Sequence, residues 1–382
     1  MADFIFKIQQ NIILGSYTAT RIGEYIKPWG SKFMLILDPT LRQVSTIDKI
    51  VQPLAERKID FFTFDDIPER PESKTIENAL KLAQQAHVSG IIAVGGYKTL
   101  SIGRAVALLF KSPKDIYANM EEDIPMTEPL PLICVPTTIR DTFVFTESIP
   151  VVDSRSSTVK MLKAPVDLTK TVLFDPNLTQ SLSDNQTACM NIETLSIALE
   201  AYLSQKATFF SDMLAEKSLE LLKYATKDST SLEVTTPQEV LLTQSGCMAS
   251  LAAATSSLGV CSLLALCLNS RYKISRSLTA AILLPHIIDD AAKFRKDKLA
   301  KVSHILEATN PDSNETKAAE DFADYVRNQL ALANLPTRLK DLGVTIEQLS
   351  LVAEDAGGLP IINTLPRSMT SEDLFDIIKL AF

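Results

Sequence analysis

The fold is decided by the stretch Ile91-Ile-Ala-Val-Gly-Gly-Tyr-Lys-Thr-Leu-Ser-Ile-Gly-Arg104. It begins with an apolar run that predicts a buried strand, which ends at Gly95-Gly96, and a helix is expected from Leu100 to Phe110. Glycine permits a tight turn and close approach of the backbone to a ligand, and a helix N-terminus offers free N–H groups to an anion. Two interpretations stay open: a ligand-binding turn, or a tight connection with no further role.

Further apolar runs on both sides of this turn alternate with helical patterns. Strands are predicted at 33–37, 59–64, 90–94 and 130–135, and helices at 44–57, 75–86 and 100–110. This alternation indicates a parallel sheet covered on both faces, which is an α/β domain. Ligands of such sheets bind at the carboxyl ends of the strands, where Asp38 follows the first strand and is placed to accept a ribose hydroxyl.

The second half of the chain has a different pattern, with long helical periodicity and few β-branched runs. Helices are predicted at 188–205, 209–224, 237–255, 259–269, 277–294, 316–333 and 371–380. We therefore expect an α/β domain over residues 1–180 and an all-α domain over residues 181–382. The uncharged stretch 240–270 is long enough to span a bilayer, but its polar residues and a helix break at 256–259 favour buried helices instead.

Composition limits the classes of function. The 382 residues are 46% hydrophobic and carry a net charge of -8, which argues against a general binder of nucleic acid or of anionic membranes. The five cysteines form no CxxC pair, and the N-terminal residues do not resemble a signal peptide, so a cytoplasmic protein with reduced thiols is expected. Only three histidines are present, so a site with several imidazole groups has few candidates.

Several segments resemble, in order, those of the iron-containing (group III) alcohol dehydrogenases, which include lactaldehyde reductase, butanol dehydrogenase and glycerol dehydrogenase. The glycine turn is similar to the family's GGGSxxDxAK pattern. The other matching segments are Val135-Pro-Thr-Thr138, Leu173-Phe-Asp-Pro-Asn-Leu-Thr179, Leu195–Ser204 with Leu199-Glu-Ala-Tyr202 inside it, Ala281-Ile-Leu-Leu-Pro-His286 and Leu365-Pro-Arg-Ser-Met-Thr370. The resemblance implies a dehydroquinate-synthase-like architecture, in which an α/β domain binds NAD(P) and a helical domain holds a divalent metal in the cleft between them.

The resemblance also implies four metal-ligand positions, one Asp and three His in the family. Here these positions hold Glu193, Ile197, Ser262 and Arg276. Isoleucine donates nothing, serine is a poor neutral ligand, and arginine is a fixed cation, so we expect no iron or zinc at this site. We predict instead that Arg276 lies within salt-bridge distance of Glu193, the alternative being an arginine that points into the cleft. Glu193 with Ser262 is a second candidate polar pair.

The family's cofactor residues are only partly matched. The resemblance assigns cofactor binding to Asp38, Gly95, Gly96, Lys98, Thr99, Thr137, Thr138 and Lys160. Bulky Tyr97, Arg140 and Phe143 stand where a dinucleotide's close approach is expected, whereas Lys98 and Arg140 add positive charge that suits an anion.

Two functional hypotheses stay open. The first is a divergent, catalytically degenerate member that binds an anionic small molecule in the interdomain cleft. The second is an active NAD- or NADP-dependent oxidoreductase in which Arg276, or a relocated metal, polarises the carbonyl and Glu193 assists. A homo-oligomeric scaffold is a third, purely structural interpretation, and the resemblance implies a homodimer; no nucleic-acid or membrane partner is expected.

Overall fold

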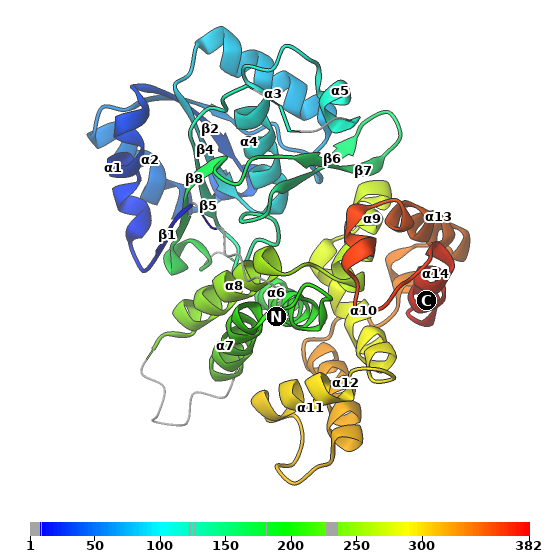
Figure 1. Ribbon diagram of the computed structural model, residues 1–382. Helices are drawn as coiled ribbons and strands as arrows, with labels where there is room; N and C mark the ends of the chain where they lie inside the picture. The colour runs from blue at the N-terminus through cyan, green and yellow to red at the C-terminus, as the bar shows by residue number, and fades with distance from the viewer. Residues whose placement is uncertain (1–7, 9, 122–123, 126, 181, 227–235) are drawn as a thin grey trace. The chain divides into compact units, whose positions relative to one another are not determined.

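A computed structural model describes residues 8, 10–121, 124–125, 127–180, 182–226 and 236–382. It divides into two compact units, residues 1–181 and 182–382 (Figure 1). The predicted α/β class of the first unit and the helical class of the second are both confirmed. Among the described residues, no single helix is long and apolar enough to cross a membrane. Two helices bent by 98° at the break between them pass that test only as a pair, on length and composition.

The first unit contains a six-stranded sheet in which every pairing is parallel. The strand order is β1-β8-β5-β4-β2-β3. The bounds are β1 (Asn11–Leu14), β2 (Lys32–Leu37), β3 (Asp60–Phe64), β4 (Gly90–Gly95), β5 (Leu132–Pro136) and β8 (Thr169–Phe174). The hairpin of β6 (Ser148–Asp153) and β7 (Thr158–Lys163) forms a separate antiparallel pair.

Helices cover both faces of this sheet (Figure 1). They are α1 (Ile22–Ile26), α2 (Asp48–Glu56), α3 (Ser73–Ala86) and α4 (Tyr97–Leu109), whereas α5 (Ile116–Glu121) packs against β7 and α3. Phe33, Leu35 and Leu37 of β2 pack with α1 and α2, whereas the alternate side chains face α4. Gly103 of α4 lies so close to β4 that a Cβ there would be 2.5 Å from that of Ala93. The strands therefore show the two-sided burial of a parallel sheet.

Four strands were predicted in the first half, and each lies in the sheet, but β1, β8, β6 and β7 were not predicted. β1 is four residues long, and β6 contains Pro150, so neither carries a strong strand pattern. β8 reads Thr-Lys-Thr-Val-Leu-Phe and is mostly buried, so it carries a strand-like pattern that sequence reasoning overlooked. The helix expected from Leu100 begins three residues earlier, directly after Gly96.

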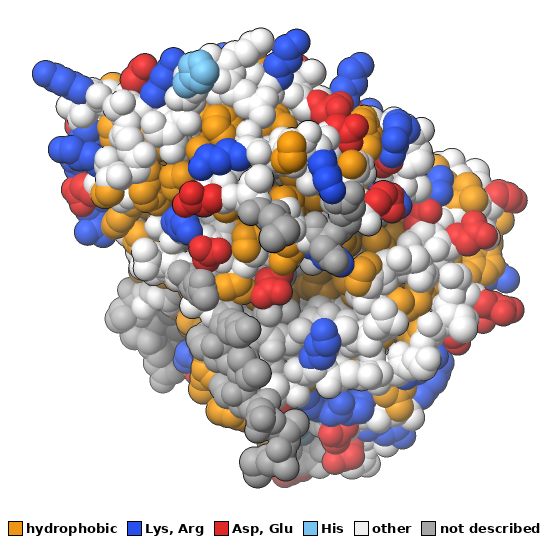
Figure 2. All heavy atoms as spheres, turned by 45° about the horizontal axis from the view of Figure 1, so that its top comes forward, with side chains coloured by type: hydrophobic (Ala, Val, Ile, Leu, Met, Phe, Trp, Pro, Cys, Tyr) orange, Lys and Arg blue, Asp and Glu red, His pale blue; other side chains and the backbone are white. Residues whose placement is uncertain are grey.

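The second unit is built from helices alone among its described residues. They are α6 (Asp184–Leu203), α7 (Phe209–Thr226), α8 (Gln238–Thr255), α9 (Val260–Tyr272), α10 (Arg276–Ala291), α11 (Lys296–Ile305), α12 (Glu315–Leu332), α13 (Ile346–Gly357) and α14 (Ser371–Leu380). The predicted break at 256–259 separates α8 from α9, whose residues are mostly buried, whereas α11 and α13 were not predicted. On the face drawn in Figure 2, basic and acidic side chains are intermingled rather than gathered in one basic patch.

Candidate functional site

Helix α6 positions Glu193 in the interior of the helical unit. The helix begins with a capping box, in which Ser183 and Gln186 satisfy each other's backbone N–H groups. From Ile192 to Leu203 every residue is buried, so this half of α6 is a core helix. Glu193 therefore has its carboxylate inside the protein, where an ionised group requires a partner of opposite charge.

That partner is Arg276, the first residue of α10. Its Nη2 lies 3.2 Å from Oε1 of Glu193, and the two side chains are 8% and 4% exposed. The predicted ion pair is therefore confirmed. A cation at a helix N-terminus is disfavoured by the helix dipole, so Glu193 offsets both the burial of Arg276 and its position on α10.

Ser262 was considered as a partner of Glu193, and this pairing is wrong. Its hydroxyl donates to Oε2 of Glu200 at 2.5 Å, and its backbone N–H donates to Oε1 of the same carboxylate at 3.0 Å. Glu200 lies on the same side of α6 as Glu193, seven residues later. The tertiary packing of α9 on α6, and not the sequence spacing, selects which of the two glutamates receives Ser262.

Glu200 was missed as a site residue, and its role is to cap α9. Burial raises the pKa of this carboxyl, while hydrogen bonds from Ser262 and from the backbone of Gly259 and Cys261 lower it in part. A Cβ on Gly259 would lie 2.8 Å from Cγ of Glu200, so the N-cap residue of α9 fits only as glycine. The sequence offered one signal, because Glu200 lies inside the quoted segment Leu199-Glu-Ala-Tyr202.

The side chains at the four positions that the resemblance assigns to metal ligands are poorly suited to hold iron or zinc. Glu193 is already ion-paired, Ile197 is fully buried and has no donor atom, and Ser262 is bonded to Glu200. Arg276 brings a fixed positive charge. Within the described part of the chain, no group of three or more His, Cys, Asp or Glu side chains has a metal-binding arrangement. Nearby Cys261 is a buried core thiol whose pKa is raised by burial, which disfavours its use as a nucleophile.

The glycine turn in the first unit brings most of the expected cofactor residues together. Gly95 has a φ of +155°, and a Cβ there would lie 2.8 Å from Thr99 and 2.9 Å from Asp38. Oδ2 of Asp38 lies 3.7 Å from Nζ of Lys98, and Oδ1 accepts the hydroxyl of Thr40 at 2.8 Å. The carboxylate that was expected to meet a ribose therefore has partners from its own chain.

The second loop reaches the same turn. Thr137 donates its backbone N–H to the carbonyl of Gly95 at 3.1 Å, and a Cβ on Gly96 would lie 3.2 Å from Thr138. The structure gives no such contact for Lys160, which is paired with Glu121 at 2.8 Å on the β6–β7 hairpin side of the unit. The turn therefore gathers seven of the eight expected cofactor residues.

Bulky side chains fill the remainder of this loop. The rings of Tyr97 and Phe143 have centroids 6.0 Å apart, and Phe143 is 2% exposed. Arg104, which sequence reasoning did not single out as a structural residue, donates to the carbonyls of Phe143, Thr146 and Ser148 at 2.5 to 3.3 Å. Burial lowers the pKa of Arg104. This guanidinium fixes the loop backbone in a closely packed conformation.

Comparison with known proteins places these features in a family context. Residues 9–176 match the family described as iron-containing alcohol dehydrogenase, and residues 187–382 match the C-terminal domain of the Fe-containing alcohol dehydrogenase family. A 1,3-propanediol dehydrogenase from Citrobacter freundii is 24% identical over 368 residues, which cover 94% of each chain.

Solved structures share the whole fold. The crystal structure of a 1,3-propanediol oxidoreductase is similar with a TM-score of 0.91 and 21% identity, covering 100% of both chains. A sulfoacetaldehyde reductase from Bifidobacterium kashiwanohense, solved in complex with NAD+, has a TM-score of 0.82 and 16% identity and covers 100% of this chain and 99% of its own. At such identities the likeness establishes the fold of this chain.

Proposed function

Because this chain belongs to the iron-containing alcohol dehydrogenase family, we propose that it is a divergent member that works without the family's metal. In this proposal it does not carry out metal-assisted hydride transfer, and it binds an anionic small molecule. The observation that carries the proposal is the buried ion pair between Arg276 and Glu193, two residues that the resemblance aligns with metal ligands.

The ion pair supports this proposal through its charge. A divalent metal beside Glu193 would need this carboxylate, which would leave the guanidinium of Arg276 buried next to a second cation. Ile197 offers no lone pair in place of an imidazole, and Ser262 is held by Glu200. Arg276 thus supplies, as a fixed monovalent charge, the countercharge that a metal would otherwise provide to this part of α6.

The glycine turn supports the binding of an anion. Gly95-Gly96 leads directly into α4, whose first turn carries Lys98, so the helix N-terminus and an ammonium group both favour negative charge there. The close packing of Tyr97 against Phe143 disfavours a dinucleotide in the family's usual position. A smaller anion, such as a phosphorylated or carboxylated metabolite, requires less of this space.

The experiment is metal analysis combined with titration of NAD(H) and NADP(H) on one purified sample. The C. freundii propanediol dehydrogenase, prepared identically, is measured alongside for comparison. We expect iron and zinc far below one ion per chain and no saturable quenching of nicotinamide fluorescence. Near-stoichiometric iron or zinc that survives dialysis would contradict the proposal.

A second candidate function follows from the same guanidinium. In an active oxidoreductase, Arg276 would stabilise the developing alkoxide of an aldehyde substrate while hydride passes from NAD(P)H. Activity of this kind would resist chelators and would be lost in Arg276→Gln. Nucleotide binding without metal, followed by chelator-resistant aldehyde reduction, would favour this function over the first.

A further inference from the structure

The loop between β5 and β6, residues 137–147, is buried over most of its length. Residues 139–145 are all buried, although connecting loops normally lie at the surface of a protein, where water pairs their backbone groups. The carbonyl groups of a buried loop need hydrogen-bond donors from within the protein. Because residues 139–145 lie outside the strands of both sheets, these donors have to come from turns in the loop or from side chains.

Arg104 of α4 supplies three of these hydrogen bonds. Its Nη1 donates to the carbonyl of Phe143 at 2.7 Å and to that of Ser148 at 3.3 Å, and its Nη2 donates to that of Thr146 at 2.5 Å. A planar guanidinium holds several acceptors in one fixed arrangement, which an ammonium group does not. The preceding residue, Gly103, sets α4 directly against β4, so the backbone from which Arg104 projects is fixed as well.

This anchoring places Phe143 against the glycine turn. The carbonyl of Phe143 accepts from Arg104, and its N–H donates to Oδ1 of Asp141 at 3.0 Å, so both of its backbone groups are held. Its ring lies beside that of Tyr97, with the two centroids 6.0 Å apart, where α4 begins directly after Gly96. The position of Phe143 over the turn therefore depends on the hydrogen bonds of the loop.

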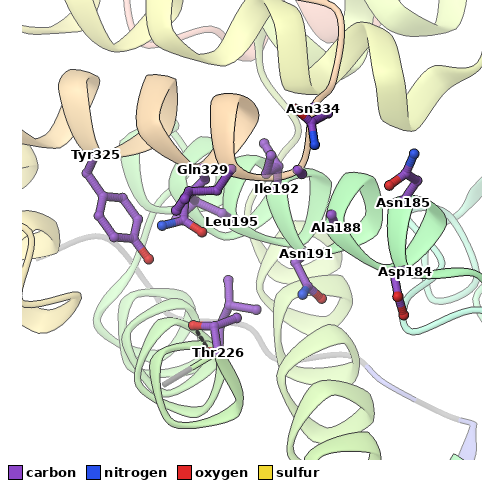
Figure 3. A pocket seen from close by; sticks show the side chains of 13 residues that line it. Asp184, Asn185, Ala188, Asn191, Ile192, Leu195, Thr226, Tyr325, Gln329 and Asn334 are labelled. Atoms are coloured by element: carbon purple, nitrogen blue, oxygen red, sulfur yellow. Dashed lines mark hydrogen bonds between the residues drawn. The ribbon is translucent and has the colours of Figure 1, made fainter. Parts of the chain in front are cut away.

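The pocket drawn in Figure 3 is less suited to an anion than the glycine turn. It measures about 350 Å³ and lies in the helical unit, where Asn191 projects from α6 and Tyr325 from α12. Its described lining residues include the carboxylate of Asp184 and no Lys, Arg or His, so they offer an anion no countercharge. The turn carries Lys98, so control of access to the turn is control of the anion proposed above.

We propose that Arg104 is a positioning residue that holds the β5–β6 loop closed against the glycine turn, and that Phe143 is the residue through which the closed loop excludes a dinucleotide. Glycine turns of this kind bind a dinucleotide by close approach of the backbone to its pyrophosphate, and the adjacent rings of Tyr97 and Phe143 obstruct that approach. A single phosphate or carboxylate group needs less space. This inference rests on the function proposed above, because it assigns to the loop the restriction of the turn to a small anion.

A gain of nucleotide binding in Phe143→Ala tests the role of Phe143. The full-length variant and the unaltered protein are titrated with NADH while nicotinamide fluorescence is followed. We expect saturable binding to the variant, at least about tenfold tighter than to the unaltered protein. The matched control is Phe145→Ala, which removes a buried ring from the same loop. That ring lies 6.1 Å from Phe174 of β8 and not beside Tyr97, so its removal should bring no gain.

The outcomes separate this inference from the proposed function. If a folded Phe143→Ala binds NADH no better than Phe145→Ala, and the unaltered protein does not bind it, the role of Phe143 is overturned while the proposed function stands. If the unaltered protein itself binds NADH saturably, both are overturned. Circular dichroism of each variant establishes that it is folded.

Arg104→Met tests the anchor. Loss of the three hydrogen bonds should release the loop, so that trypsin cleaves after Arg140, which is buried in the unaltered protein, and NADH binding should rise as in Phe143→Ala. Arg155→Met, which removes an exposed guanidinium paired with Asp153, is the control and should change neither. If Arg104→Met fails to fold, Arg104→Lys replaces it, since it keeps the charge but not the planar set of donors. A folded Arg104 variant that stays uncut after Arg140, or that gains no NADH binding, overturns the positioning role.

Discussion

The glycine turn of the first unit and the Arg276–Glu193 region of the second have diverged in different ways. In the turn, side chains have changed at Tyr97 and Lys98, yet the strand, the two glycines and the start of α4 remain as the family pattern implies. In the helical unit the scaffold also persists, and the proposed function interprets the Arg276–Glu193 ion pair as a replacement for a bound metal. A site built from backbone groups tolerates side-chain changes, whereas a metal site loses its chemistry with its donor atoms.

The largest loss of stability is expected from removing one partner of the Arg276–Glu193 ion pair. Glu193→Leu leaves Arg276 buried beside an apolar side chain, and this should lower the free energy of unfolding by about 3–5 kcal/mol. Urea denaturation followed by circular dichroism measures it. The control is the double variant Glu193→Leu with Arg276→Met, which should recover most of the loss. A single variant as stable as the unaltered protein would show that the pair is not coupled.

A smaller effect is expected from the backbone of the turn. Gly95→Ala places a Cβ 2.8 Å from Thr99 at a φ of +155°, so it should cost about 1–3 kcal/mol and weaken binding at the turn. Gly343→Ala is the matched control, since its φ is also positive, at +78°, but nothing lies within 4 Å. If both alanine variants lose the same stability, as measured by urea denaturation, crowding at Gly95 contributes nothing.

The capping carboxylate of Glu200 should make the stability of the protein depend on pH. Its pKa in the folded state is raised by burial, so the folded protein binds its proton more tightly than the unfolded chain. Its contribution to stability is therefore present below the unfolded pKa of about 4.3 and declines as the pH rises through the folded value. The stability of the unaltered protein relative to Glu200→Gln should fall as the pH rises above about 4.3. A difference that stays constant with pH, or that grows, contradicts this assignment.

The smallest change in stability is expected at Lys98, the partly exposed residue of the glycine turn. Lys98→Met removes an ammonium group 3.7 Å from Asp38 whose side chain is 24% exposed, so stability should change by less than about 1 kcal/mol. Binding of inorganic phosphate, measured by calorimetry, should nevertheless weaken if an anion binds at this turn. Lys74→Met, on the exposed face of α3, controls for the loss of one positive charge. Unchanged phosphate binding in Lys98→Met would separate Lys98 from the proposed anion site.

The apolar runs and glycine punctuation were sufficient to predict the α/β class, four of the six sheet strands and most of the long helices. The four-residue strand β1 could not be predicted, because it is a strand only through pairing with the distant β8. In the candidate site, the Arg276–Glu193 pair was predictable because a buried cation and a buried anion each need a partner. The hydrogen bond between Ser262 and Glu200 was not predictable, because Glu193 and Glu200 lie on one face of α6 and either could accept from the Ser262 hydroxyl.

The sequence alone determined which donor atoms Ile197, Ser262 and Arg276 can offer a metal, since the donor atoms of a residue do not depend on its neighbours. It also determined the strand–Gly-Gly–helix unit, because glycine conformation and apolar periodicity are local properties. Only the tertiary structure decided that Arg104 anchors the loop carbonyls of residues 143–148, that Lys160 pairs with Glu121, and that a pocket opens beside Asn191. These features depend on residues from separate elements, and only packing sets their distances.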